Sequence, residues 1–440
     1  MGFKFNTLLR AILAGGGVAA APSLPQSANL VARWSADSLS LADGAAVDTW
    51  TDSINGYVAT QSTALRKPTF KTNTLGGKPS LLFNGAWMDA GRPAAVVAAL
   101  DGAERTIFIV FKTAGTTSNG MLFNTAPAGG GSFMLVADGT NAGRYNATVP
   151  HASTAFSTLG SVKATGAASH RTAINGSQAY VTDLDTTTSS GNNVYFGGIL
   201  NSTFMVNAHI FDILVWNKAL TAPELLAAQK WACDKYSQPY PWAAFSDFIV
   251  YAGNSLTQGS GALGANSYPY KSAQSLSRPY GSWTNIGQGG INMAAVDTVC
   301  SVHADPLPAQ LGKTVKVAAF EYYNSKAQSA ATIEATSRTY LANRKAAGIL
   351  NVWGTSLSHA ADPDTTRNTF DAAFDANQTN VDSYVPLHLN ASIGAEGADS
   401  GGGNAYFNNS ATYWSDVVHL NSAGYTVLAA LMTAGIQALP

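Results

Sequence analysis

Residues at the two ends of the C-terminal half have the types and spacing needed to cleave an ester. Ser255 follows an apolar run, Phe248–Ala252, and Gly253, so it stands at the end of an expected buried strand. A serine hydroxyl is a poor nucleophile until a base removes its proton. Asp416 precedes His419 by three residues, so its carboxylate can fold back onto Nδ1 and leave Nε2 free to reach the serine. The pattern predicts acyl transfer by a Ser255–His419–Asp416 triad.

The elements that must position this triad alternate between strand and helix. Val315–Phe320 and the start of a run at Ile349 are further apolar strands, and Ala327–Ala347 has the polar face of an exposed helix. Strands that alternate with helices predict a parallel sheet covered on both faces. Ligands of such sheets bind at the carboxyl ends of the strands, which is where Ser255 stands.

The ordered set of segments resembles the SGNH, or GDSL-like, hydrolase family. Residues 253–256, Gly-Asn-Ser-Leu, are similar to the first block of that family, and Asp416 with His419 is similar to its last block. Asn285–Gly290 and Tyr322–Ser325 are similar to the second and third blocks. The resemblance covers residues 246–440 and implies a three-layer α/β, flavodoxin-like domain.

The resemblance also implies an oxyanion hole. Its donors would be the Ser255 N–H, the Gly290 N–H and the Asn324 amide, which would meet the charge that develops on the carbonyl oxygen. The sequence departs from the family pattern in two places. Asn254 replaces the usual aspartate of the first block, and the third block lacks its glycine and its final aspartate. An active esterase and a catalytically inactive domain are therefore both open.

The N-terminal half has a different rhythm, with short strands separated by turn residues. Expected strands are Thr106–Lys112, Ser132–Ala137, Asn193–Gly197 and Ala208–Trp216. This pattern predicts an all-β sandwich or jelly roll. Thr221 and Glu224 then form a capping box that opens a helix reaching about Lys235.

The N-terminal half also resembles a concanavalin A-like, laminin-G-like jelly roll over residues 28–236. The resemblance rests on Trp34 with Asp37, on Val47-x-x-Trp50-x-Asp52, and on the closing strand before the capped helix. Domains of this kind often bind glycans, although a fold does not determine a function. Trp50 and Trp87 are expected in the core rather than on a sugar-binding surface. The proline-containing segment 237–245 is the expected linker to the second domain.

Composition limits the remaining possibilities. Only 12% of the residues are charged, against roughly 25% in a typical soluble domain, and the net charge is -1. The chain therefore lacks the basic surface that nucleic acid requires. No apolar run is long enough to span a membrane, and no ligand cluster for a metal or cofactor is evident. Cys233 and Cys300 are expected to be buried free thiols, and His303, His359 and His388 to be structural or surface residues.

Residues 1–27 allow two interpretations. Lys4 and Arg10 precede the small-residue stretch 11–21, a pattern typical of a signal peptide or of a retained docking segment. We expect a virion or extracellular protein that removes acyl groups, above all O-acetyl, from a polysaccharide or cell-surface glycan held by the lectin-like domain. Other virion proteins would bind through the N-terminal segment. The alternative is an inactive receptor-binding appendage of a virion, such as a tail fibre.

Overall fold

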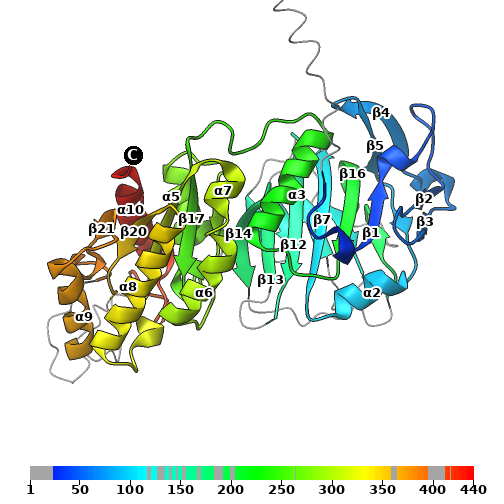
Figure 1. Ribbon diagram of the computed structural model, residues 1–440. Coiled ribbons are helices and arrows are strands. Elements are labelled where there is room, and N and C mark those ends of the chain that lie inside the picture. Colours follow the sequence, from blue (N-terminus) through cyan, green and yellow to red (C-terminus); the bar gives the residue numbers. More distant parts are fainter. Residues whose placement is uncertain are drawn as a thin grey trace, which may run out of the picture.

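Two parts of the chain, one rich in strands and one of α/β type, lie side by side in the computed structural model (Figure 1). The structure describes residues 23–115, 120–125, 134–137, 141–144, 147–150, 155–165, 170–182, 192–198, 204–262, 264–357, 364–394, 412–416 and 418–440. Most of the expected N-terminal segment, residues 1–22, and His359 lie outside these ranges. No helix within them has the length and apolar character to cross a membrane.

The strand-rich part contains, within the described residues, two eight-stranded antiparallel sheets. The first runs in the order β14 (Ser177–Thr182), β13 (His170–Ile174), β12 (Ser157–Lys163), β7 (Arg105–Thr113), β16 (Asn207–Trp216), β5 (Lys78–Asn84) and β4 (Thr69–Leu75), with β1 (Leu30–Ser35) also paired to β16. The second runs β11 (Ala147–Pro150), β10 (Asn141–Arg144), β9 (Met134–Ala137), β8 (Met121–Asn124), β15 (Tyr195–Phe196), β6 (Met88–Asp89), β3 (Val58–Thr60) and β2 (Thr49–Thr51). Its helices are α2 (Ala94–Asp101), α3 (Ala222–Lys235), and the 3-10 turns η1 (Ser27–Asn29), η2 (Ala36–Ser38) and η3 (Ala64–Arg66).

The side-chain period of two explains how the sheets are buried. Along β7, Ile107 and Ile109 enter the cluster shared by both sheets, whereas Phe108 and Val110 enter the cluster under α3. Both faces of β7 are therefore covered. The expected strands Thr106–Lys112 and Ala208–Trp216 are confirmed as β7 and β16, but Asn193–Gly197 is reduced to the two residues of β15. Of Ser132–Ala137, residues 132 and 133 lie outside the described ranges.

The two tryptophans expected in the core have different environments. Trp50 is fully buried, and its Nε1 donates to the Ser35 carbonyl oxygen at 2.9 Å. The expectation for Trp87 is wrong, because this side chain is only half-buried, edge-on to Tyr195 with ring centroids 5.9 Å apart. Asp52 accepts hydrogen bonds from the N–H groups of Ile54 and Asn55, so it stabilises the turn after β2.

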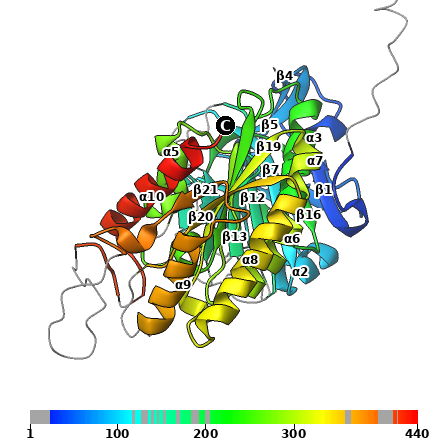
Figure 2. The ribbon, with the colours of Figure 1, turned by 60° about the vertical axis from the view of Figure 1, so that its left-hand side comes forward.

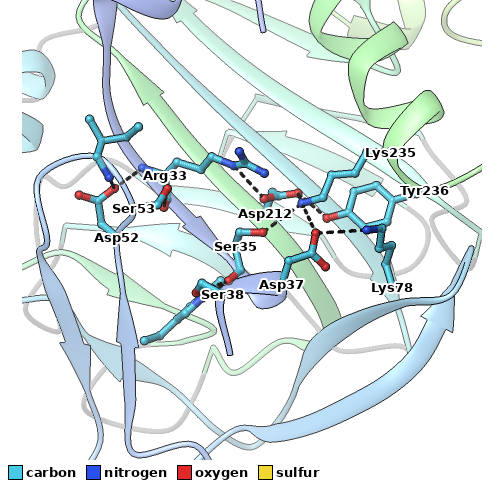
Figure 3. Close-up of polar contacts among 12 residues, drawn as sticks. Arg33, Ser35, Asp37, Ser38, Asp52, Ser53, Lys78, Asp212, Lys235 and Tyr236 are labelled. Carbon is cyan, nitrogen blue, oxygen red and sulfur yellow. Dashed lines mark hydrogen bonds and ion pairs between the residues drawn. The ribbon is translucent and has the colours of Figure 1, made fainter. Parts of the chain in front are cut away.

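A buried carboxylate fastens the end of α3 to the first sheet (Figure 3). Asp212 on β16 is fully buried and accepts from Lys235 Nζ at 2.7 Å, from the Tyr236 hydroxyl and, at 3.4 Å, from Arg33 Nε. A buried charge is tolerated only when it is paired and hydrogen-bonded. The capping box at the other end of α3 is confirmed, since Thr221 and Glu224 each accept a hydrogen bond from the other's backbone.

The α/β part is built on a parallel sheet. Its strands run in the order β18 (Trp283–Asn285), β17 (Asp247–Gly253), β19 (Thr314–Phe320), β20 (Ile349–Gly354) and β21 (Ser383–Val385). The helices are α4 (Ser255–Gln258), α5 (Tyr268–Ser275), α6 (Met293–His303), α7 (Leu307–Leu311), α8 (Ala330–Ala346), α9 (Asp364–Ala376) and α10 (Ser422–Gln437), with 3-10 turns η4 (Gly264–Asn266), η5 (Tyr323–Ser325) and η6 (Leu387–Leu389).

Helices cover both faces of this sheet, as the alternation of strands and helices predicts. Along β17, Phe248 and Val250 pack into a cluster with residues of α6, α8 and α9. Ile249 and Tyr251 point the other way, into a cluster with residues of α5 and α10. Figure 2 shows α6, α8 and α9 on one side of the strands and α5 and α10 on the other.

Cys233 and Cys300 are free and buried, as expected.

The two parts meet where an edge strand of each lies against the other. The N–H of Gln178 on β14 donates to Thr284 Oγ1 on β18 at 3.2 Å, and the Gly281 N–H donates to Ser177 Oγ at 2.5 Å. The segment 237–245 is packed rather than free, because Trp242 is 5% exposed and joins the cluster of Phe248. A domain boundary there stays a prediction, and the two parts share buried surface across it.

His303 joins the end of α6 to the start of α3. It accepts a hydrogen bond from the Ala222 N–H at Nδ1, 3.0 Å away. Burial, with a smaller contribution from the nearby Arg171 charge, lowers the pKa of His303 to about 3. The expectation of a structural role is thus supported for His303. His388 also makes fold contacts, with Thr355 Oγ1 at 2.8 Å and Asp375 Oδ2 at 3.2 Å.

His303→Asn should reduce the sensitivity of the fold to acid. An unfolded histidine takes a proton as pH falls below about 6.5, whereas folded His303 does not, so folding stability falls between pH 6.5 and 4. The loss is on the order of 3 kcal/mol, because one pKa unit equals about 1.4 kcal/mol. Asparagine keeps an acceptor for the Ala222 N–H but does not titrate. Urea unfolding of both proteins at pH 7 and pH 4.5 measures the difference, and equal losses in the two proteins would contradict it.

Candidate active site

Two neighbouring strands bring the reactive groups of the site to one edge of the sheet. β17 and β19 run parallel with Gly253 opposite Phe320, so the residues that follow both strands emerge side by side. Gly253 has φ +149°, and a Cβ there would lie 3.0 Å from the Phe320 carbonyl oxygen. Asn254 then caps α4 by accepting from the Leu256 N–H at 2.9 Å. Ser255, the first residue of α4, is half-buried at this edge.

The structure brings the three predicted triad residues together. His419 Nε2 lies 3.1 Å from Ser255 Oγ, and His419 Nδ1 lies 2.9 Å from Asp416 Oδ2. Both are hydrogen-bond distances, although Ser255 and His419 are 164 positions apart in the chain. The expected geometry, with an imidazole between a hydroxyl and a carboxylate, is therefore present in the folded chain.

The carboxylate determines which imidazole nitrogen carries the proton. Burial alone would raise the pKa of Asp416, but hydrogen bonds from the His419 ring and from backbone N–H groups outweigh it, and the pKa lies below the usual aspartate value. An ionised carboxylate only accepts hydrogen bonds, so Nδ1 of His419 must donate. In a neutral ring Nε2 then has a lone pair directed at the Ser255 hydroxyl.

A tight turn holds this imidazole in place. Asp416 Oδ1 accepts from the Val418 and His419 N–H groups, both at 2.7 Å, which folds the carboxylate back onto the ring. The Ser415 N–H donates to the His419 carbonyl oxygen at 2.9 Å and closes the turn. Helix α10 begins directly after it, with Asn421 accepting from the Ala423 N–H at 2.9 Å.

The two other predicted oxyanion donors stand on adjacent turns. Gly290 is exposed, with φ +74°, in the turn between β18 and α6. Asn324 is half-buried on η5, and its Nδ2 donates to the carbonyl oxygen of Ile291 at 3.0 Å. That bond fixes Asn324 against the Gly290 turn. A side-chain amide carries two N–H groups, so one remains for a substrate oxygen.

A buried acid at this edge was not predicted from the sequence. Glu321 follows β19 and is 2% exposed. Burial raises its pKa to about 7, and hydrogen bonds from Ser325, Asn324 and Asn254 only partly offset that rise. In the sequence, Glu321 is a single charged residue directly after an apolar strand. The local sequence does not determine whether such a side chain is buried or exposed.

The solved structures that resemble this chain share little sequence with it. No family model matches the chain, and neither does any curated protein. A protein from Desulfitobacterium hafniense described as lipolytic and of the G-D-S-L family is 13% identical, with a TM-score of 0.33, over 43% of this chain and 99% of that one. Domain 4 of the extracellular arabinanase AbnA from Geobacillus stearothermophilus, in complex with arabinotriose, is 15% identical, with a TM-score of 0.32, over 46% of this chain and 98% of that one.

Sialidases match in the same range. The Trypanosoma rangeli enzyme is 13% identical, with a TM-score of 0.32, over 49% of this chain and 34% of that one. This chain spans about a quarter to a third of the length of the sialidases that it matches, with 26% for NanB from Streptococcus pneumoniae. These scores are too low to define a shared fold. The geometry of the site is therefore the basis for assigning a function to this chain.

Replacing Gly261 should displace the His419 turn. A Cβ at Gly261 would lie 2.5 Å from Ser415 Oγ, 2.8 Å from the Leu420 carbonyl oxygen and 2.9 Å from His419 Cβ, closer than these atoms can approach. We expect Gly261→Ala to abolish the downfield proton resonance of the hydrogen-bonded imidazole in NMR spectra.

Gly312→Ala is the matched control for this substitution. Gly312 also has a positive φ, +62°, but nothing lies within 4 Å of an added Cβ. Both substitutions place an alanine at a positive φ, which costs about 1 to 2 kcal/mol. They differ in that only the Gly261 substitution brings the added Cβ too close to neighbouring atoms. An unchanged imidazole resonance in Gly261→Ala would contradict the packing described for this turn.

Proposed function

We propose that the chain is a serine esterase that removes acyl groups, above all O-acetyl, from a polysaccharide. The observation that carries this proposal is the continuous set of hydrogen bonds from Asp416 through His419 to Ser255, at 2.9 and 3.1 Å. The same arrangement of hydroxyl, imidazole and carboxylate serves acyl transfer on unrelated folds. Ser255 and Gly290 are accessible from solvent, so a substrate can reach them.

The proposed reaction has two halves. Ser255 Oγ attacks the carbonyl carbon while His419 Nε2 takes the hydroxyl proton, and Asp416 stabilises the imidazolium that forms. The negative oxygen of the tetrahedral intermediate is stabilised by the N–H groups of Ser255 and Gly290 and the amide of Asn324. The intermediate collapses as the sugar alcohol leaves with the proton from His419. Water then attacks the acyl-serine with His419 as base, and the acid is released.

A polysaccharide substrate is supported by the position of the strand-rich part. Its edge strands β11 and β14 contact η4, and β14 also contacts α4, which begins with Ser255. A glycan bound near these edge strands would therefore lie next to the acyl-transfer site. In this proposal the strand-rich part is a jelly-roll lectin-like domain, the α/β part is an SGNH-type domain, and the protein acts on a virion or outside the cell.

Ser255→Ala should abolish hydrolysis of a chromogenic acetyl ester, because no other hydroxyl faces His419 Nε2 among the hydrogen bonds of the described residues.

Asp416→Asn should lower kcat by at least about 100-fold, because an amide can hold the ring in the wrong tautomer. Ser301→Ala, at an exposed serine on α6, is the matched control and should retain full activity. Initial rates and melting temperatures of all four proteins provide the measurement.

Full activity in Ser255→Ala would exclude the proposed nucleophile. If instead the wild-type protein is inactive on acetyl esters and on acetylated glycans, the inactive receptor-binding appendage becomes the better account. Asn254 and the altered third block are the sequence features that favour that alternative.

A further inference from the structure

Glu321 is a buried acid for which the proposed reaction has no use. It is the residue that follows β19, and its carboxyl group accepts a hydrogen bond from the backbone of Asn324, one of the predicted oxyanion donors. Burying an acid of this kind is unfavourable unless its oxygens are hydrogen-bonded. The contacts of Glu321 therefore indicate what the side chain does for the fold or for the site.

The hydrogen bonds of Glu321 directly reach two of the three loops that supply an oxyanion donor, and Ser325 extends the connection to the third. Oε1 accepts from the Asn324 N–H at 2.8 Å and lies 3.5 Å from Asn254 Nδ2, directly before Ser255. Oε2 is 2.6 Å from Ser325 Oγ. Ser325 Oγ in turn accepts from the Met293 N–H at 3.3 Å, three residues beyond Gly290.

We propose that Glu321 is the positioning residue of the oxyanion hole, because its carboxyl group bonds to the loops of Ser255 and Asn324 and is connected through Ser325 to the start of α6, which follows the Gly290 turn. This inference rests on the proposed function of the site. Oxyanion donors are effective only when they are already aimed at the charge that develops. Removing the link should therefore lower kcat and leave KM nearly unchanged, because the ground-state carbonyl depends less on these donors.

The protonation state of Glu321 should also affect the rate. The groups that face it are Asn254, Asn324 and Ser325, and no charged side chain contributes to its pKa shift among the described residues. Its pKa of about 7 means that it is largely neutral below that pH and ionised above it. An ionised carboxylate next to a developing oxyanion opposes that charge. The rate should therefore fall with rising pH as Glu321 ionises.

Two substitutions separate positioning from charge. Glu321→Ala removes the link, and we expect kcat for a chromogenic acetyl ester to fall about 10- to 100-fold while KM changes less than about threefold. Glu321→Gln keeps the size and hydrogen-bonding capacity but cannot ionise. It should retain kcat within about threefold at pH 6 and lose the fall in rate above pH 7. Glu334→Gln, on the surface of α8, is the matched control and should behave as wild type.

The outcomes are distinguishable. An unchanged kcat in Glu321→Ala, or a wild-type pH profile in Glu321→Gln, would overturn the positioning role while the esterase proposal stands. An inactive wild type would overturn the esterase proposal and this inference with it. If Glu321→Ala does not fold, Glu321→Gln decides by its pH profile. Infrared difference spectra provide a readout independent of activity, since the protonated carboxyl band should titrate near pH 7 in wild type and be missing in Glu321→Gln.

Discussion

The site depends on one imidazole, that of His419, which must hydrogen-bond to two side chains at once. Ser255 and Asp416 come from opposite ends of the sequence of the α/β part. His419 can donate to Asp416 and accept from Ser255 only if the turn that carries Asp416 and His419 packs against the loop after α4. Two features make this possible. Asp416 and Ser415 fold the turn back on itself, and Gly261 lets the backbone of the two loops approach closely. The sheet, the helices and the glycine positions hold His419 Nε2 within hydrogen-bonding distance of Ser255 Oγ.

Buried polar groups act in the same way elsewhere in the chain, by joining segments that are distant in sequence. Asp212 connects β16 to the end of α3 and to Arg33, and His303 connects α6 to the start of α3. Glu321 connects the loops after β17 and β19. Each loses contact with water and regains hydrogen bonds only in one arrangement of the chain, so each favours that arrangement over alternatives.

Local patterns in the sequence predicted what local physics controls. Runs of apolar residues located β7, β16 and β17 to within about one residue, and the Thr221–Glu224 spacing located the start of α3. The strand end at Ser255 and the three-residue spacing of Asp416 and His419 also predicted that these side chains could meet. The rest depends on tertiary contacts. Whether Glu321 turns inward, whether Trp87 is covered, and how segment 237–245 packs depend on residues far away in the chain.

Covalent trapping of the serine tests the central claim most directly. A fluorophosphonate reacts with a serine that has an activated hydroxyl and leaves a stable phosphonyl group on it. The proposed triad predicts a single adduct, located by peptide mass spectrometry on Ser255, and none after His419→Ala in a protein that remains folded. Absence of any adduct, labelling of a different residue, or equally fast labelling without His419 would contradict it.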